Sequence, residues 1–201
     1  MDVLEAIRTR RSHGRMLPDS PPRELIERVL AAAVCAPNHY LTEPWRFVVL
    51  TGEAREALGR AQEAALRRSL AEPDAPEHQA ALAKERAKPL RSPVVVIAAV
   101  EKSTLPKAVW LEDVCATAAA VQNLLLAAHA EYLAAIWRTG ETAYSPEVKE
   151  AVGLSPDAQV IGIVYLGYPD RAQPPADRAG RAVPVEWRGW AAETQTAAAP
   201  L

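Results

Sequence analysis

The sequence LEDVCATAAAVQNLLLAAHAE, residues 111–131, determines the architecture of this chain, because it predicts a long helix without a polar face. At 1.5 Å per residue this helix is about 30 Å long. Its apolar residues cannot lie on one stripe; they are Val114, Cys115, Ala118, Val121, Leu124, Leu125, Leu126 and Ala128. A helix that is apolar nearly all the way round is buried on several sides, so we expect a partner subunit to cover part of it.

The segments on either side of this helix predict a small sheet. Pro93 introduces VVVIAAV, residues 94–100, a continuous apolar run of the kind that is buried on both faces of a sheet. Further strands are expected at Trp45–Leu50, Leu133–Trp137 and Gln159–Leu166, which are rich in β-forming residues. Helices around one small sheet make an α+β fold.

Other periodic segments predict the helices that surround this sheet. Residues Val3–Thr9 are expected to form a short helix with Leu4 and Ile7 turned inward. Two charged, Ala-rich stretches, Glu53–Leu70 and Pro76–Lys88, read as a helix pair that covers the molecule and does not build its core.

The composition fits one soluble domain over residues 1–201, in which residues from about 170 to 201 form an extended arm with little periodicity. Hydrophobic residues are 49% and charged residues 24%, as in an ordinary globular protein. The net charge of −2 and the pI of about 6.1 argue against nucleic acid or an anionic membrane as a partner. A small-molecule ligand fits this balance better.

Several features favour a cytoplasmic location. Cys35 and Cys115 have apolar neighbours and no ligand spacing, so we expect reduced, buried thiols. The start MDVLE has no basic region followed by an apolar run, and therefore no signal peptide is expected. The stretch Ala118–Ala130 is interrupted by polar residues and reads as too polar and too short to span a bilayer.

The sequence lacks the common motifs for nucleotides, metals and catalytic nucleophiles. The patterns GxGxxG, GxxxxGK[ST], GxSxG, HExxH and the EF-hand loop are absent, and the four histidines are dispersed. We therefore expect no metal site and no catalytic triad.

Arg10-Arg11-Ser12 closes the first predicted helix and places two guanidinium groups beside a hydroxyl. Guanidinium forks match phosphate oxygens, and a serine hydroxyl adds a further donor. The cluster suits a phosphate, although a basic helix end also serves as a solvated cap.

Three later segments also carry unusual residues. The loop APNHYLTEPW, residues 36–45, lies between a helix and a buried strand, where ligand contacts concentrate. WRTG, residues 137–140, follows a strand, and LGYP, residues 166–169, precedes the arginines of the tail. Each segment also has an ordinary structural interpretation: a stiff connector, a tryptophan that fills the core, or a turn before a solvated tail.

In this order and spacing, the four segments resemble the FMN-dependent nitroreductase family, above all its small, compact members. The resemblance runs from Val3 to about Pro184. It implies an α+β fold with a small, mostly antiparallel central sheet flanked by helices, in an intertwined homodimer with FMN at the subunit interface. The chain departs from the family pattern at Leu41 and Glu43, where many members carry Asn and Gln. These two positions therefore lack the side-chain amides that the family pattern offers to flavin or substrate.

The resemblance also implies which residues bind FMN. Arg10, Arg11 and Ser12 would hold the phosphate and the ribityl chain. An arginine of the tail commonly joins the phosphate in this family, and we choose Arg181 ahead of Arg178.

The ring contacts are implied at two further places. Trp137, Arg138 and Thr139 would lie along the isoalloxazine, while Asn38 and His39 would reach the flavin of the other subunit. A donor near flavin N5 and a positive charge near N1 and O2 would stabilise the reduced, anionic flavin. Thr139 and Arg138 are our hypothesis for these two roles.

The activity that the resemblance implies is the reduction of nitroaromatic, quinone or related acceptors with NADH or NADPH. The flavin N5 would carry the chemistry in a ping-pong cycle, so no side chain is expected to be catalytic. Two alternatives stay open. One is another flavin reaction on the same scaffold, such as reductive dehalogenation or flavin fragmentation, and the other is a flavin-binding protein without turnover.

Overall fold

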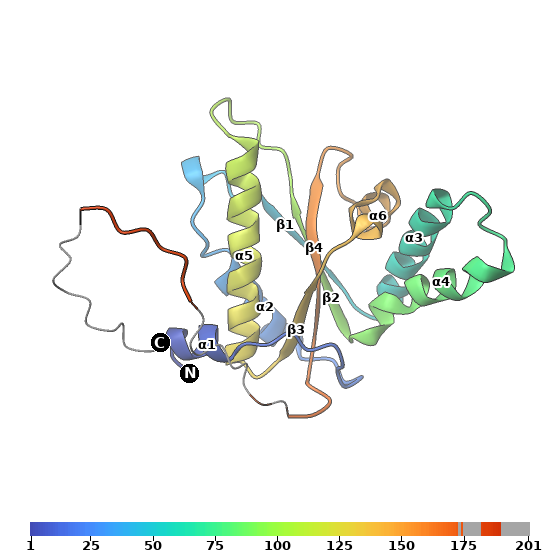
Figure 1. Ribbon diagram of the computed structural model, residues 1–201, viewed down its shortest axis with the longest axis horizontal. Coiled ribbons are helices and arrows are strands. Elements are labelled where there is room, and N and C mark those ends of the chain that lie inside the picture. The colour runs from blue at the N-terminus through green and yellow to red at the C-terminus, as the bar shows by residue number, and fades with distance from the viewer. Residues whose placement is uncertain (173, 175–181, 190–201) are drawn as a thin grey trace.

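The computed structural model describes residues 1–172, 174 and 182–189, and the helices and strands between residues 3 and 167 fold around a four-stranded sheet (Figure 1). The strand order is β1-β2-β4-β3, and each neighbouring pair is antiparallel. The strands are β1 (Trp45–Leu50), β2 (Val94–Val100), β3 (Ala134–Arg138) and β4 (Gln159–Gly167). The predicted α+β fold and the four predicted strands are confirmed, with strand ends within one residue of the expected ones.

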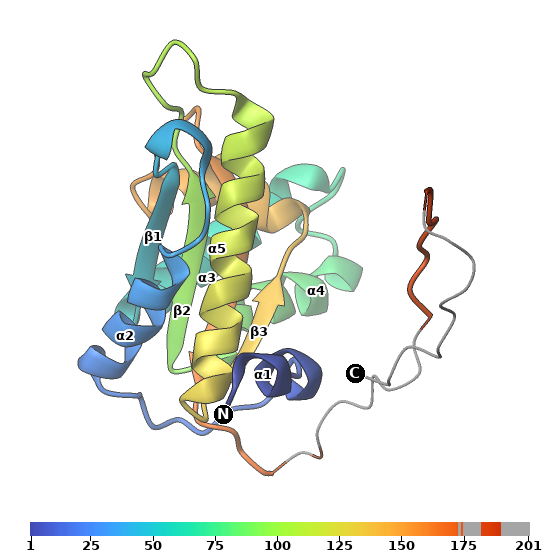
Figure 2. The same cartoon turned by 90° about the vertical axis from the view of Figure 1, so that its left-hand side faces the viewer.

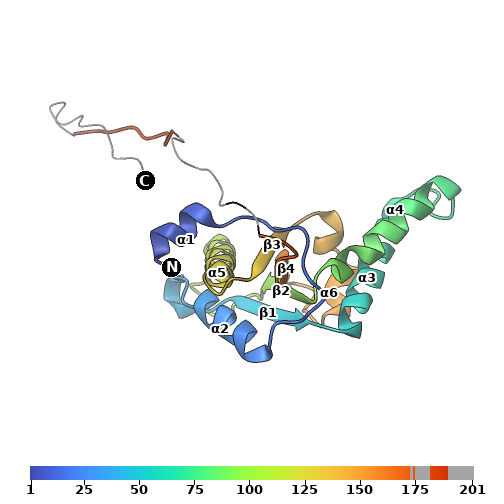
Figure 3. The ribbon, with the colours of Figure 1, turned by 90° about the horizontal axis from the view of Figure 1, so that it is seen from below.

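Helices cover both faces of the sheet (Figures 1 and 3). On one face α2 and α5 pack against the strands, and on the other α3 and α6 do so, while α4 lies along α3. The helix bounds are α1 (Val3–Thr9), α2 (Arg23–Ala33), α3 (Glu53–Ser69), α4 (Pro76–Ala87), α5 (Trp110–Ala130) and α6 (Pro146–Ala151). Short 3-10 turns form η1 (His39–Leu41), η2 (Lys88–Arg91) and η3 (Glu141–Tyr144).

The strand β2 is the most deeply buried element, as its apolar run predicts. Every residue from Val94 to Val100 is at most 1% exposed, because β1 and β4 flank the strand and helices cover both faces. Side chains alternate between the faces of a strand. Val96 therefore packs with the α2–α5 layer and Ile97 with the α3–α6 layer.

The long helix α5 begins one residue earlier than predicted and runs along the sheet (Figure 2). Val121 and Leu124 face the core and are fully buried, but Leu111 is 69% exposed. This chain therefore covers only one side of the helix. By length and composition alone, its 21 residues could cross a membrane, so the expectation of a segment too short and too polar was wrong on those criteria. In this fold α5 is a helix packed on a sheet.

Three expectations about burial were also wrong. In α1 only Ala6 is buried, whereas Leu4 and Ile7 are 56% and 44% exposed, because α1 packs beside the C-terminal part of α5 at the margin of the described fold. Cys35 and Cys115 are free but exposed thiols. The first charged helix, α3, was expected to cover the molecule without building its core, but its Leu58 is fully buried in the core.

Candidate functional site

The segment after α1 follows the outer edge of β3. The amide of His13 donates to the carbonyl of Ala135 at 3.0 Å, and the amide of Leu17 donates to the carbonyl of Tyr168 at 2.9 Å. Between them, a Cβ placed on Gly14 would lie 4.0 Å from Nη2 of Arg138. The fold therefore brings Arg10-Arg11-Ser12 to the same sheet edge as the predicted strand-end residues.

This edge is strongly basic. Arg10 and Arg11 are half-buried and Ser12 is exposed. Nη1 of Arg11 donates to the carbonyl of Pro174 at 2.7 Å, and no carboxylate in the described part of the chain forms an ion pair with Arg11. Two guanidinium groups beside an exposed hydroxyl form a donor set suited to an anion.

Two histidines lie beside these arginines. Nε2 of His129 is 2.8 Å from Oγ1 of Thr9, and Nδ1 of His13 is buried without a hydrogen-bond partner. Burial, followed by the charge of Arg11, lowers the pKa of His13. Burial, His13 and Arg10 lower the pKa of His129. The two imidazoles therefore favour their neutral forms, while the edge keeps the positive charge of the arginines.

The predicted ring-contact residues alternate across the sheet. Trp137 packs on the α2–α5 face, and its Nε1 donates to the carbonyl of Ile161 at 3.2 Å. Its indole occupies the space above Gly162, where an added Cβ would lie only 1.9 Å from Nε1. Arg138 lies on the opposite face, where it and Thr139 line a cavity.

That cavity has a volume of about 130 Å³ and lies between the sheet, α3, η2 and η3. Its lining is Gln62, Lys88, Arg91, Arg138, Thr139, Thr142, Ala143, Ile163 and Tyr165. Arg91 also lines a second cavity of about 530 Å³, together with Gly14, Arg15, Met16 and Asp170. Gln62, Lys88 and Arg91 were not predicted, because they lie between Leu50 and Pro93, a region without a recognisable motif.

The loop with Asn38 and His39 lies at the far end of α5. Nδ1 of His39 is 2.7 Å from Oε2 of Glu112, and Oδ1 of Asn38 accepts from the amide of Glu43 at 3.0 Å. Tyr40, Leu41 and Glu43 all have positive φ angles, which are strained for residues with side chains. The loop borders an open, largely apolar pocket of about 640 Å³ lined by Pro37, Asn38, His39, Leu111, Glu112, Cys115, Ala116 and Ala119.

The two groups of predicted residues are far apart within one chain. The His39 loop contacts α5 at Glu112, while the Arg10 edge contacts it at His129 through Thr9. Seventeen residues of helix separate these points, or about 26 Å at 1.5 Å per residue. One chain alone therefore does not bring Asn38 and His39 to Arg10 and Arg138.

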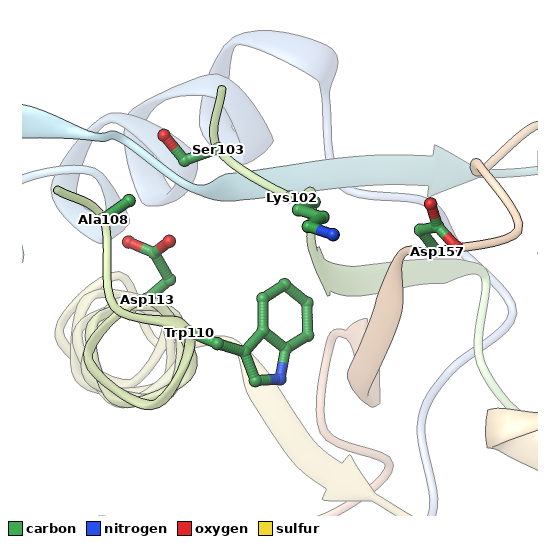
Figure 4. Close-up of a pocket in the computed structure, with 6 residues that line it drawn as sticks. All are labelled: Lys102, Ser103, Ala108, Trp110, Asp113 and Asp157. Atoms are coloured by element: carbon green, nitrogen blue, oxygen red, sulfur yellow. The ribbon is translucent and has the colours of Figure 1, made fainter. Parts of the chain in front are cut away.

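A further pocket lies at the start of α5 (Figure 4). Its volume is about 360 Å³, and its lining is Lys102, Ser103, Ala108, Trp110, Asp113 and Asp157. Asp113 is buried and accepts a 2.7 Å hydrogen bond from Thr42. The described ranges contain no group of three or more His, Cys, Asp or Glu residues placed to hold a metal ion. Arg178 and Arg181, the predicted phosphate ligands of the tail, lie outside the described residues.

Comparison with known proteins gives one consistent result. The model of the Nitroreductase family matches residues 7–168. A relative in Escherichia coli K12, provisionally named NAD(P)H nitroreductase YdjA, is 32% identical over 169 residues, which is 84% of this chain and 89% of that protein.

Two solved structures are similar along most of their length. A nitroreductase-like family protein from Bacillus cereus has a TM-score of 0.72 and 27% identity, covering 89% of this chain and 91% of its own. A protein from Desulfovibrio desulfuricans, provisionally described as a nitroreductase and solved in complex with FMN, has a TM-score of 0.66 and 26% identity. That match covers 85% of this chain and 88% of the other.

Proposed function

The chain belongs to the nitroreductase family of oxidoreductases, and we propose that it uses FMN to pass electrons from NADH or NADPH to nitroaromatic, quinone or related acceptors. The observation that carries this proposal is the convergence at one sheet edge. Segments 10–14 and 134–139 lie side by side there. They bring Arg11, whose guanidinium forms no ion pair with a described carboxylate, to the same edge as the cavity-lining Arg138 and Thr139.

The first half of this edge fits the phosphate of FMN. Arg10, Arg11 and Ser12 offer charged and neutral donors. No carboxylate of the described residues pairs with Arg11, so its guanidinium would bind a phosphate without first breaking an ion pair. Arg181, with Arg178 as the second choice, would add a further guanidinium. The contact between Arg11 and Pro174 supports this role, because it places Pro174, seven residues before Arg181, beside Arg11.

The second half fits the isoalloxazine. Trp137 is held by its hydrogen bond to Ile161 and by the packing of its indole against Gly162. The backbone that follows Trp137 is therefore fixed in position. Thr139 would donate near N5, and Arg138 would place positive charge near N1 and O2. When bound, FMN supplies hydride transfer to and from N5. The side chains of this edge hold it, orient it and set the electrostatic field around it.

We further propose that two copies of the chain form a homodimer with FMN at the interface. Leu4, Ile7 and Leu111 leave apolar surface exposed on α1 and α5, which is where a partner would remove it from water. Because Asn38 and His39 lie about 26 Å of helix away from the Arg10 edge, they would serve the flavin of the partner. We place such an enzyme in the cytoplasm.

An anaerobic single turnover tests the acceptor class. The protein is loaded with FMN, reduced with one equivalent of NADPH or NADH, and mixed with nitrobenzene or a benzoquinone. We expect the flavin spectrum to return to its oxidised form as a two-electron product appears. If neither acceptor reoxidises the flavin faster than free reduced FMN is reoxidised, the proposed reaction is wrong.

A further inference from the structure

Three cations line the cavity behind Arg138, namely Lys88, Arg91 and Arg138, and of these three only Lys88 forms an ion pair with a described residue. Glu85 is 6% exposed, but Lys88 forms an ion pair with it and Thr142 donates a 2.7 Å hydrogen bond to it. The negative charge of Glu85 is therefore balanced by Lys88 and does not neutralise the two arginines. Arg91 and Arg138 form neither an ion pair nor a hydrogen bond with any described residue, although both line the cavity.

These two guanidinium groups converge on one buried phenol. Burial raises the pKa of Tyr165 to about 12, while the charges of Arg138 and Arg91 act in the opposite direction. Arg138, from β3, and Arg91, from η2, line the same cavity as Tyr165. Two like charges that share a cavity repel each other, so an electron-rich group bound between them would be stabilised.

The same cavity contains an amide without a partner. Gln62 of α3 is 3% exposed, and its Oε1 has no hydrogen-bond partner among the described residues. Leaving a buried polar group unsatisfied typically costs about 1–3 kcal/mol. A primary amide offers one acceptor and two donors, which matches an imide edge, where a C=O group and an N–H group lie side by side. A simple inorganic anion has no donor for the amide oxygen.

We propose that Arg91, together with Arg138 and Gln62, binds the pyrimidine edge of the isoalloxazine. This inference rests on the proposed function. The pyrimidine edge carries the imide that Gln62 would complement and the N1 and O2 atoms that the two guanidinium groups would contact. The cavity of about 130 Å³ has room for an edge of the ring system, and Arg91 also lines the larger neighbouring cavity beside Gly14. Arg91 would therefore position the flavin and stabilise its reduced form.

The test compares Arg91→Gln with Arg60→Gln in the full-length protein. Arg60 is an exposed α3 residue paired only with Glu56, so the control makes the same change away from the cavity. For Arg91→Gln we expect about tenfold weaker FMN binding, as for the loss of one hydrogen bond to a charged group. The midpoint potential of bound FMN should become more negative, because the reduced form loses a stabilising cation. Arg60→Gln should match the wild type in both measurements.

Riboflavin separates the ring from the phosphate. Arg91→Gln should weaken binding of riboflavin, which has no phosphate, by the same factor as binding of FMN, whereas Arg10→Ala should weaken FMN binding more than riboflavin binding. Gln62→Met gives a second readout. The apo protein should melt at the same or a higher temperature because an unsatisfied buried amide is removed, yet its flavin binding should weaken.

Two results would overturn the inference while leaving the proposed function intact. The first is an Arg91→Gln variant with wild-type FMN affinity and midpoint potential. The second is unchanged flavin binding in Arg91→Gln with a raised KM for 4-nitrobenzoate but not for nitrobenzene, which would assign the cavity to an anionic acceptor. A wild-type protein that binds no FMN would overturn both proposals.

Discussion

Arg8 and Arg10 lie two positions apart at the end of α1, but the proposed function gives them different tasks. Arg8 is exposed on the helix, whereas Arg10 is half-buried at the basic edge. Arg10→Ala should weaken FMN binding about tenfold or more, because a charge-assisted phosphate contact is lost. Arg8→Ala removes the same charge from the same helix and should change the affinity by less than about twofold. Fluorescence titration of the apo protein measures both, and equal affinities for the two variants would exclude the phosphate role.

The neutral histidines of this edge predict how stability depends on pH. The folded-state pKa of His13 lies below its ordinary value of 6.5. Below pH 6.5 the unfolded chain therefore binds more protons than the folded one. We expect the apo protein to keep its full stability above pH 6.5 and to lose stability as the pH falls through the window below it. Urea unfolding at a series of pH values measures this, and the slope should shrink in His13→Asn. An unchanged slope in that variant would contradict the assignment.

Sequence motifs predicted part of the site and could not predict the rest. Arg10-Arg11-Ser12 and Trp137-Arg138-Thr139 are contiguous in sequence, so a local pattern identifies them. Gln62 and Arg91 belong to α3 and η2, which carry no motif, and only tertiary packing brings them to Arg138. The cavity they share therefore has no signature in the sequence.

At the level of elements, one tight side-chain contact reinforces the antiparallel pairing of β3 with β4. A Cβ at residue 162 would lie 1.9 Å from Nε1 of Trp137, so Gly162→Ala must displace the indole and break its hydrogen bond to Ile161. Overpacking of this kind costs about 1–3 kcal/mol. We expect a lower free energy of unfolding in urea and weaker FMN binding, because the end of β3 shifts. In a double-mutant cycle, Trp137→Leu should recover part of the lost stability, and strictly additive effects would count against the contact.

The elements themselves were more predictable than their surroundings. The composition and apolar pattern of the sequence located α1, α3 and α5 to within about one residue, but they do not say what covers an apolar face. The pattern of Leu4 and Ile7 is the same for a core and for an interface between subunits, so the inward orientation was wrong. The charged composition of α3 likewise hid the fact that Leu58 lies in the core.

At the level of the whole molecule, the exposed apolar surface of α1 and α5 predicts a dimer. Leu111→Glu places a charge on that surface, beside Glu112 and the His39 loop, and should shift the protein from dimer to monomer in sedimentation velocity. FMN binding should weaken in parallel, since the partner would no longer supply its loop. Ala80→Glu, on the exposed side of α4, is the matched control and should leave the dimer intact. A Leu111→Glu protein that stays dimeric and binds FMN normally would place the interface elsewhere.

The most direct test is the visible spectrum of the purified full-length protein, saturated with FMN, freed of unbound flavin, and recorded anaerobically before and after NADH or NADPH is added. The proposed function predicts about one bound FMN per chain, whose oxidised absorption bands bleach with at least one of the two nicotinamides. A chain that retains no flavin after saturation, or whose bound flavin neither nicotinamide reduces, would contradict it.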